Sequence, residues 1–185
     1  MVFISPQKIV LSGPEGYCYE EVEMSQLELS NFLGNCSSST NKTQFKKFTG
    51  HRLRDVRIFA ARGVTFDGSR VVYVTLLTRL LAVDTSTDMV EVVAHCPAYA
   101  TNSLAFDIAS GDVVMTTGHA LIRVDLNSGS CDVIAGSTEE GSSAGNIETS
   151  GFSSPMGLVK IGRSDWLFAD RGNNRFDQPL QPCNL

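Results

Sequence analysis

Apolar residues in the middle of the chain fall into short runs that are separated by clusters of turn-forming residues. The runs are three to five residues long and rich in Val, Ile, Thr and Tyr, which favour β-strands. Turn formers such as Asp67-Gly68-Ser69 lie between them. Runs of this length are too short for helices, so the pattern predicts an all-β fold. The predicted strands are 64–66, 71–75, 80–83 and 90–94, followed by 104–106, 113–116, 121–124 and 131–135.

These two groups of strands are copies of one repeat. Gly63–Asp67 matches Ser103–Asp107, which lies 40 residues later, and Leu81–Asp84 matches Ile122–Asp125, which lies 41 residues later. Four antiparallel strands in about 40 residues is the arrangement of a β-propeller blade. A lone blade has two apolar faces and can bury them only against neighbouring blades. The repeat therefore predicts β-propeller blades, each a four-stranded antiparallel sheet.

A third copy follows after a Gly/Ser-rich loop, at a larger offset of about 54 residues. Its segments 135–137, 152–158 and 169–176 resemble, in order, the motif of the NHL repeat family. The resemblance implies a propeller of the six-bladed, TolB-like kind that presents loops to protein partners and, in some members, to RNA. The residues that carry the motif are Pro155, Gly157, Asp170, Gly172, Asn173 and Arg175.

Each motif residue suits a local backbone requirement. Pro155 can begin a strand because no ladder donor is needed there. We expect Gly157 to permit close packing near the propeller axis, and Gly172-Asn173 to form a hairpin turn with positive φ. Asp170 and Arg175 flank this turn, and we expect them to form an exposed pair that contributes about 0–1 kcal/mol.

The repeats divide the chain into about three blades of a partial ring, whereas closed propellers have about four to eight. We therefore expect a fragment of a larger protein, whose open blade edges also allow self-association. Of the preceding blade we expect only the third and fourth strands, Tyr19–Glu23 and Gln26–Leu29. The expected segments are 1–33, the end of a preceding blade; 34–61, a polar loop and connection; 62–101, a blade; 102–136, a blade; 137–154, the Gly/Ser-rich loop; 155–176, a half blade; and 177–185, a divergent tail with two prolines.

The charge balance argues against nucleic acid as a partner, because the net charge is -5 and no extended basic cluster is present. No apolar run approaches the roughly 20 residues that a membrane span needs. We expect no signal peptide within this sequence, since the apolar start Val2–Ile4 is short and Pro6 follows it.

Two N-glycosylation sequons, at Asn35 and Asn41, lie in one polar stretch and favour an extracellular or cell-surface setting. Five scattered cysteines agree with that setting. Their number is odd and several pairings are possible, so the sequence alone assigns no disulfide.

Three functional hypotheses fit the sequence. The first is a non-catalytic scaffold that binds a protein partner, with no cofactor, no catalytic residue and no metal ligand. The second is a metal-dependent hydrolase or lyase that resembles gluconolactonase or the peptide-amidating lyase, whose metal lies on the propeller axis and needs inward acids or histidines from several blades. The third is a module of an extracellular receptor or matrix protein.

The available histidines and aspartates favour the scaffold over the enzyme. We expect His51 in a polar loop, His95 after a fourth strand and His119 in a hairpin turn, which places all three at the surface. Aspartates recur at equivalent strand ends, where they are better explained as turn residues that accept hydrogen bonds from backbone amides than as catalytic groups. These aspartates are Asp67, Asp84, Asp107 and Asp125.

Overall fold

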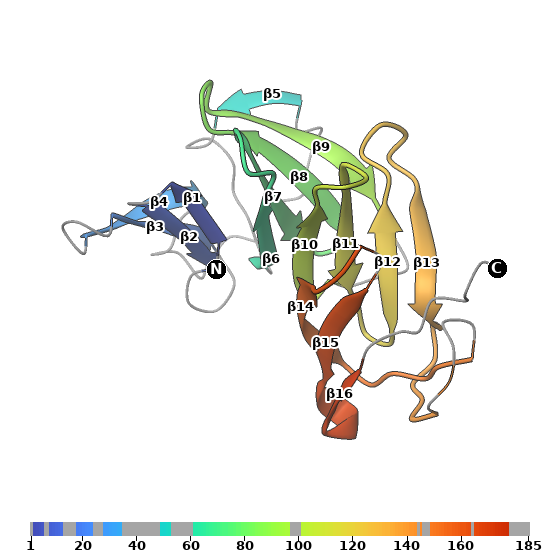
Figure 1. Cartoon of the computed structure of the whole chain (residues 1–185). Coiled ribbons are helices and arrows are strands. Elements are labelled where there is room, and N and C mark those ends of the chain that lie inside the picture. The colour runs from blue at the N-terminus through green and yellow to red at the C-terminus, as the bar shows by residue number, and fades with distance from the viewer. Residues whose placement is uncertain are drawn as a thin grey trace. The chain divides into compact units, whose positions relative to one another are not determined.

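The computed structural model describes the chain in two compact units, Met1–His95 and Cys96–Leu185 (Figure 1). The described residues are 2–5, 8–12, 18–23, 28–34, 49–52, 61–96, 101–143, 145, 149–163 and 165–177. Apart from Ile4, side chains are described only from Arg62 onward. The strands of the described residues form four antiparallel sheets.

The N-terminal sheet has four strands in the order β1-β2-β3-β4, where we expected only the last two. The two additional strands form a hairpin in which Ser5 pairs with Lys8, so that only two residues separate them. Each of these strands is a short apolar run, and so short a run gives only a weak strand signal unless its pairing partner is recognised. The strands are β1 (Val2–Ser5), β2 (Lys8–Ser12), β3 (Cys18–Glu23) and β4 (Glu28–Gly34).

The next sheet contains the first predicted repeat and one additional strand. Its four predicted strands are confirmed as β6 (Ala61–Phe66), β7 (Val71–Leu76), β8 (Arg79–Asp84) and β9 (Met89–His95). The fifth strand, β5 (Thr49–Arg52), pairs with the outer edge of β9 and gives the order β5-β9-β8-β7-β6. Two predictions are thereby corrected: residues 34–61 are not loop and connection throughout, and His51 lies in a strand. The polar segment is extended because it pairs with the edge of β9.

The second repeat forms a four-stranded sheet in the order predicted. Its strands are β10 (Ser103–Asp107), β11 (Asp112–Thr116), β12 (Ala120–Val124) and β13 (Cys131–Gly136). Buried apolar side chains lie on both faces of this sheet, as the positions of alternate residues and cross-strand partners show. One face includes Leu104, Met115 and Ile122, and the other includes Val114 and Leu121.

The last sheet has three strands, one more than the half blade that we expected. The strands are β14 (Pro155–Lys160), β15 (Trp166–Asp170) and β16 (Arg175–Asp177), and a short 3-10 helix, Arg171–Asn173, joins the last two. The third strand was missed because Arg175–Asp177 is short and contains two charged residues. The rest of the predicted tail, 178–185, lies outside the described residues.

The sheet of β14–β16 packs against the sheet of β10–β13 through one apolar cluster. Phe152, which precedes β14, contributes a ring 4.9 Å from that of Phe168 in an edge-to-face arrangement. Phe152 thereby anchors the Gly/Ser-rich loop to the core. The buried members of the cluster are Val114, Leu121, Ala135, Phe152, Leu158, Trp166 and Phe168.

Candidate functional site

The motif residues after β15 surround the buried carboxylate of Asp170, whose exposed fraction is 0%. Its Oδ1 accepts a hydrogen bond of 2.7 Å from the backbone amide of Ser153. Its Oδ2 accepts a hydrogen bond of 2.6 Å from Asn173 Nδ2 and lies 3.2 Å from Arg175 Nε. A buried carboxylate is tolerated when it is paired and its oxygens are hydrogen-bonded, and Asp170 meets both conditions.

Asn173 and Arg175 extend this network to the Gly/Ser-rich loop. Asn173 Nδ2 also donates to the carbonyl of Gly141 at 2.8 Å. The guanidinium of Arg175 donates to the carbonyls of Ser142 at 2.8 Å and Gly151 at 2.9 Å. Two side chains of the β15–β16 connection therefore hold both arms of the loop. We call the described residues of this loop, 137–143, 145 and 149–154, the clasped loop.

The clasped loop also has hydrogen bonds of its own. The amide of Gly141 donates to the carbonyl of Phe152 at 3.1 Å, and that of Gly151 donates to the carbonyl of Ser143 at 3.0 Å. Ser153 Oγ donates to Glu140 Oε1 at 2.6 Å. Backbone bonds between the two arms, together with the side chains of Asn173 and Arg175, hold the described arms of the loop against each other. Glu139, Ser142 and Ser143 are exposed on it.

The structure corrects three expectations about the motif. The Asp170–Arg175 pair forms, but it is not an exposed pair, because Asp170 is fully buried. Positive φ falls on Asn174 (54°), not on Gly172. Gly172 is required for space, since a Cβ there would lie 2.8 Å from the carbonyl oxygen of Ser153. Gly157 has positive φ (60°) and open space around it, so its role is conformational and does not involve close packing.

Pro155 is buried and is the first residue of β14, in agreement with its predicted role. Asn35 and Asn41, the glycosylation candidates, lie outside the described residues.

The recurring aspartates accept hydrogen bonds from turn amides, as the sequence predicted. Burial tends to raise the pKa of Asp67, but bonds from the amides of Ser69 and Arg70 outweigh it and leave the pKa below its ordinary value. In Asp84, the hydroxyl and amide of Ser86 lower the pKa of the carboxyl. These bonds favour the charged carboxylate and stabilise the turns.

Asp125 follows the same rule, because the amides of Ser128 and Asn127 lower its pKa. Burial of Asp107 acts to raise its pKa, but hydrogen bonds from Lys160 and from the amide of Ala109 outweigh this effect and lower it. The Asp107–Lys160 ion pair joins the ends of β10 and β14, and the Lys160 ammonium lies 5.5 Å from the centre of the Trp166 ring.

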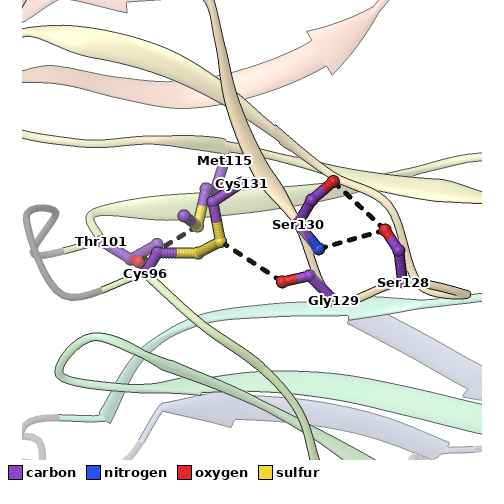
Figure 2. The surroundings of a disulfide bond; sticks show 7 residues. All are labelled: Cys96, Thr101, Met115, Ser128, Gly129, Ser130 and Cys131. Carbon is purple, nitrogen blue, oxygen red and sulfur yellow. Dashed lines mark hydrogen bonds between the residues drawn. A yellow bond between two sulfur atoms is a disulfide. The ribbon is translucent and has the colours of Figure 1, made fainter.

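Cys96 and Cys131 form a disulfide in the second unit, with Cα atoms 5.9 Å apart (Figure 2). The bond connects the residue that directly follows β9 to the first residue of β13. Figure 2 also shows Thr101 Oγ1 within 3.4 Å of Met115 Sδ beside the bond. Sequence reasoning left the cysteine pairing open, because spacing alone does not choose among five cysteines.

Two of the three histidines have described side chains, and neither joins a cluster of possible metal ligands. His95 is exposed at the end of β9, and His119 is half-buried between β11 and β12 with no hydrogen-bond partner on its Nδ1. Over the described ranges, no three His, Cys, Asp or Glu side chains gather into a possible metal site. None of the helical segments in these ranges has the length and apolar character of a membrane span.

The comparisons with known proteins found no matching family model and no matching curated protein. Among solved structures, the chain is similar to a Bacteroides thetaiotaomicron protein of unknown function, with a TM-score of 0.64 and 15% identity over 91% of this chain and 41% of that chain. It is also similar to an auxiliary nutrient binding protein from Bacteroides thetaiotaomicron, with a TM-score of 0.54 and 12% identity over 94% of this chain and 52% of that chain.

A chain of a nidogen/laminin complex matches with a TM-score of 0.51 and 11% identity over 94% of this chain and 65% of that chain. The chain thus spans less than two thirds of the length of each of these three structures. At these identities the likeness concerns the fold alone. Together with the antiparallel four-stranded sheets, it shows that the chain is an all-β protein built from β-propeller blades.

Proposed function

We propose that the chain is a non-catalytic, NHL-type propeller segment of a larger protein and that it binds a protein partner through the clasped loop. The observation that carries the proposal is the set of hydrogen bonds that Asn173 and Arg175 donate to the clasped loop. Asn173 and Arg175 hold three loop carbonyls at 2.8–2.9 Å through side chains that reach across 24 to 33 residues of sequence. A loop fixed in advance loses less conformational entropy when it binds, which favours affinity.

The exposed groups of the loop fit a protein surface with basic and hydrogen-bonding residues. Glu139 and the serines at 142 and 143 are exposed, and the chain has a net charge of -5. Loops supported by a rigid scaffold commonly carry recognition. The nutrient binding protein and the nidogen/laminin complex are examples of binding proteins with related folds.

We also propose that the chain belongs to an extracellular receptor or matrix protein and is glycosylated at Asn35 and Asn41. The Cys96–Cys131 disulfide supports this setting, since such bonds persist in oxidising compartments. After secretion from a cultured animal cell behind an added signal peptide, we expect a glycosidase-sensitive mass shift that Asn35→Gln and Asn41→Gln each reduce. Secreted material that is fully reduced and carries no glycan would contradict the proposal.

To test binding, the chain is immobilised on a surface and its affinity is measured for each member of a panel of purified secreted and cell-surface ectodomains that includes laminin. We expect at least one ectodomain whose affinity falls about tenfold or more with Glu139→Lys. The matched control is Glu91→Lys, which reverses an exposed carboxylate on β9. Arg175→Ala should weaken the same partner by releasing the loop. A partner that is indifferent to both loop variants, or the absence of any partner, would argue against the loop as the binding element.

A further inference from the structure

The last strands of the two central repeats, β9 and β13, are paired in the same register. All five pairs between β12 and β13 recur between β8 and β9 at positions 41 residues earlier, such as Leu121–Ala135 and Leu80–Ala94. The irregularity that follows the Leu121 pair also recurs after the Leu80 pair. Because register decides which backbone groups point away from a sheet, the outer edge of β13 presents the same series of N–H and C=O groups as the equivalent edge of β9.

The outer edge of β9 is occupied, whereas that of β13 is open. β5 pairs with β9 at three positions, and two of them are Glu91 and Val90. These two residues correspond to Asp132 and Cys131 of β13, and the third position corresponds to Ser130, which directly precedes the strand. Over the part of the chain that the structure describes, β13 is the last strand of its sheet and no strand pairs with its outer edge. The first repeat thus shows how the edge of the second can be filled.

The outer edge of β13 is accessible and held in place. Asp132 and Val133 are consecutive and so point to opposite faces of the sheet, yet the side chain of Asp132 is 56% exposed and Val133 is 45% exposed. The disulfide from Cys131 to the buried Cys96 fixes the start of the strand, and the buried Ala135 anchors its other end. An edge that is already ordered loses little conformational entropy when it pairs with a further strand.

We propose that the outer edge of β13 is a second binding surface, at which an extended segment of a protein partner adds to the sheet as an antiparallel strand. Strand addition draws its affinity from main-chain hydrogen bonds and its selectivity from side chains beside the edge. β5 indicates the chemistry of the segment, because Thr49–Arg52 contains no acidic residue and includes a His and an Arg. Asp132 lies at the limit of an ion pair with Arg123, 4.0 Å away, and can accept a further cation from such a segment.

A larger propeller would leave this edge free. Neighbouring blades cover the faces of a sheet, as the β14–β16 sheet covers Val114 and Leu121. The outer edge of a sheet is not covered when sheets stack face to face. The edge of β13 is therefore open to a partner in the larger protein as well as in this chain.

The test uses the full chain with its disulfide intact and a synthetic peptide with the sequence of residues 46–54, which contains β5. Hydrogen exchange read by mass spectrometry locates the bound peptide without any substitution. At a peptide concentration about ten times its dissociation constant, we expect the exchange of the outward-pointing amides of β13 to slow about tenfold. The same peptide N-methylated at residues 49–52 keeps its side chains but loses its main-chain donors, so its affinity should fall about tenfold or more.

Two charge reversals test the position of the site. Asp132→Lys should weaken peptide binding about fivefold or more, whereas the matched control Glu139→Lys, on the clasped loop, should leave it unchanged. Absence of peptide binding, equal affinity of the N-methylated peptide, or an equal loss in the two variants overturns the proposal.

Protection confined to β9 overturns it as well, because the peptide then only replaces β5. Protection of β13 that rises with chain concentration in the absence of peptide assigns the edge to a second copy, which also overturns the proposal. The outcome is separable from binding through the clasped loop, because Asp132 and Glu139 lie on different elements. A chain that binds an ectodomain but no peptide refutes only the β13 edge, and a chain that binds the peptide alone refutes only the loop.

Discussion

The buried carboxylate of Asp170 separates two accounts of the motif. If Asp170 and Arg175 formed an exposed pair, as their flanking positions suggest, replacing the aspartate would cost about 0–1 kcal/mol. The structure instead buries Asp170 completely and gives it three partners, Ser153, Asn173 and Arg175. The substitution Asp170→Ala removes the acceptor of every one of these contacts.

The expected loss follows from those contacts. A hydrogen bond to a charged group contributes about 1.5–3 kcal/mol, and removal of one member of a buried ion pair costs about 3–5 kcal/mol. Arg175 keeps its bond of 2.6 Å to Asp177 and its two loop carbonyls, which places the loss at the lower end. We expect Asp170→Ala to lower the free energy of unfolding by about 3–4 kcal/mol. Asp170→Asn retains the acceptor for Ser153 and should cost about 2 kcal/mol.

Urea unfolding monitored by tryptophan fluorescence measures this loss directly, because Trp166 is the sole tryptophan and lies in the core cluster that also contains Phe152 of the clasped loop. Limited proteolysis with a glutamate-specific protease adds a local readout, since Glu139 and Glu140 lie in the clasped loop. Native-state cleavage there should accelerate in Asp170→Ala. The control, Asp132→Ala on an exposed position of β13, should change stability by less than about 0.5 kcal/mol.

A loss of about 1 kcal/mol or less for Asp170→Ala, together with unchanged cleavage of the loop, would refute the claim that the buried Asp170 network stabilises the fold and holds the clasped loop. The motif would then be a surface turn whose charged residues contribute little.

Three further substitutions test other features. Cys131→Ser removes a disulfide that spans 35 residues, which should cost about 4 kcal/mol and make stability less sensitive to reductant in equilibrium urea unfolding; an equal response to reductant before and after substitution would exclude the bond. Gly172→Ala pushes a methyl group against Ser153 and should cost about 1–3 kcal/mol, whereas a neutral result in thermal melts would show that the clasp relaxes. Lys160→Met should cost about 1.5–3 kcal/mol at pH 7. Because the pKa of Asp107 is lowered in the folded state, this contribution is full above about pH 5 and is lost as the pH falls below about 4, so the difference between variant and parent should shrink at pH 3 in urea titrations.

The sequence predicts the eight strands of the two central repeats because each is an apolar run between turn residues. Their pairing is local, so pattern and turn chemistry are sufficient. Strand β5 shows the limit of this reasoning. Thr49–Arg52 has no apolar pattern, and its extended form depends on the edge of β9, which lies about 40 residues later in the chain.

The motif residues were identified from sequence, but their roles were only partly predicted. Asp170 looks like a turn residue because its neighbours in the chain are polar. Its burial depends on the Ser153 amide 17 residues earlier and on a loop that folds back over it. Gly172 likewise suggests a turn position that requires positive φ. In the structure a glycine is needed there because any side chain would collide with Ser153. Non-local contacts of this kind leave no periodic signal in the sequence.

The origin of β5 has a practical consequence for anyone who dissects this protein. The outermost strand of the second sheet comes from residues that precede the innermost strand, β6, so the sheet extends beyond its own repeat in the sequence. A truncated chain that begins at the repeat boundary near residue 61 would retain β6–β9 and lose the strand that covers β9. The bare backbone of β9 would then be free to recruit other chains, and insoluble material from such a truncation would reflect the position of the cut rather than an intrinsic instability of the blade.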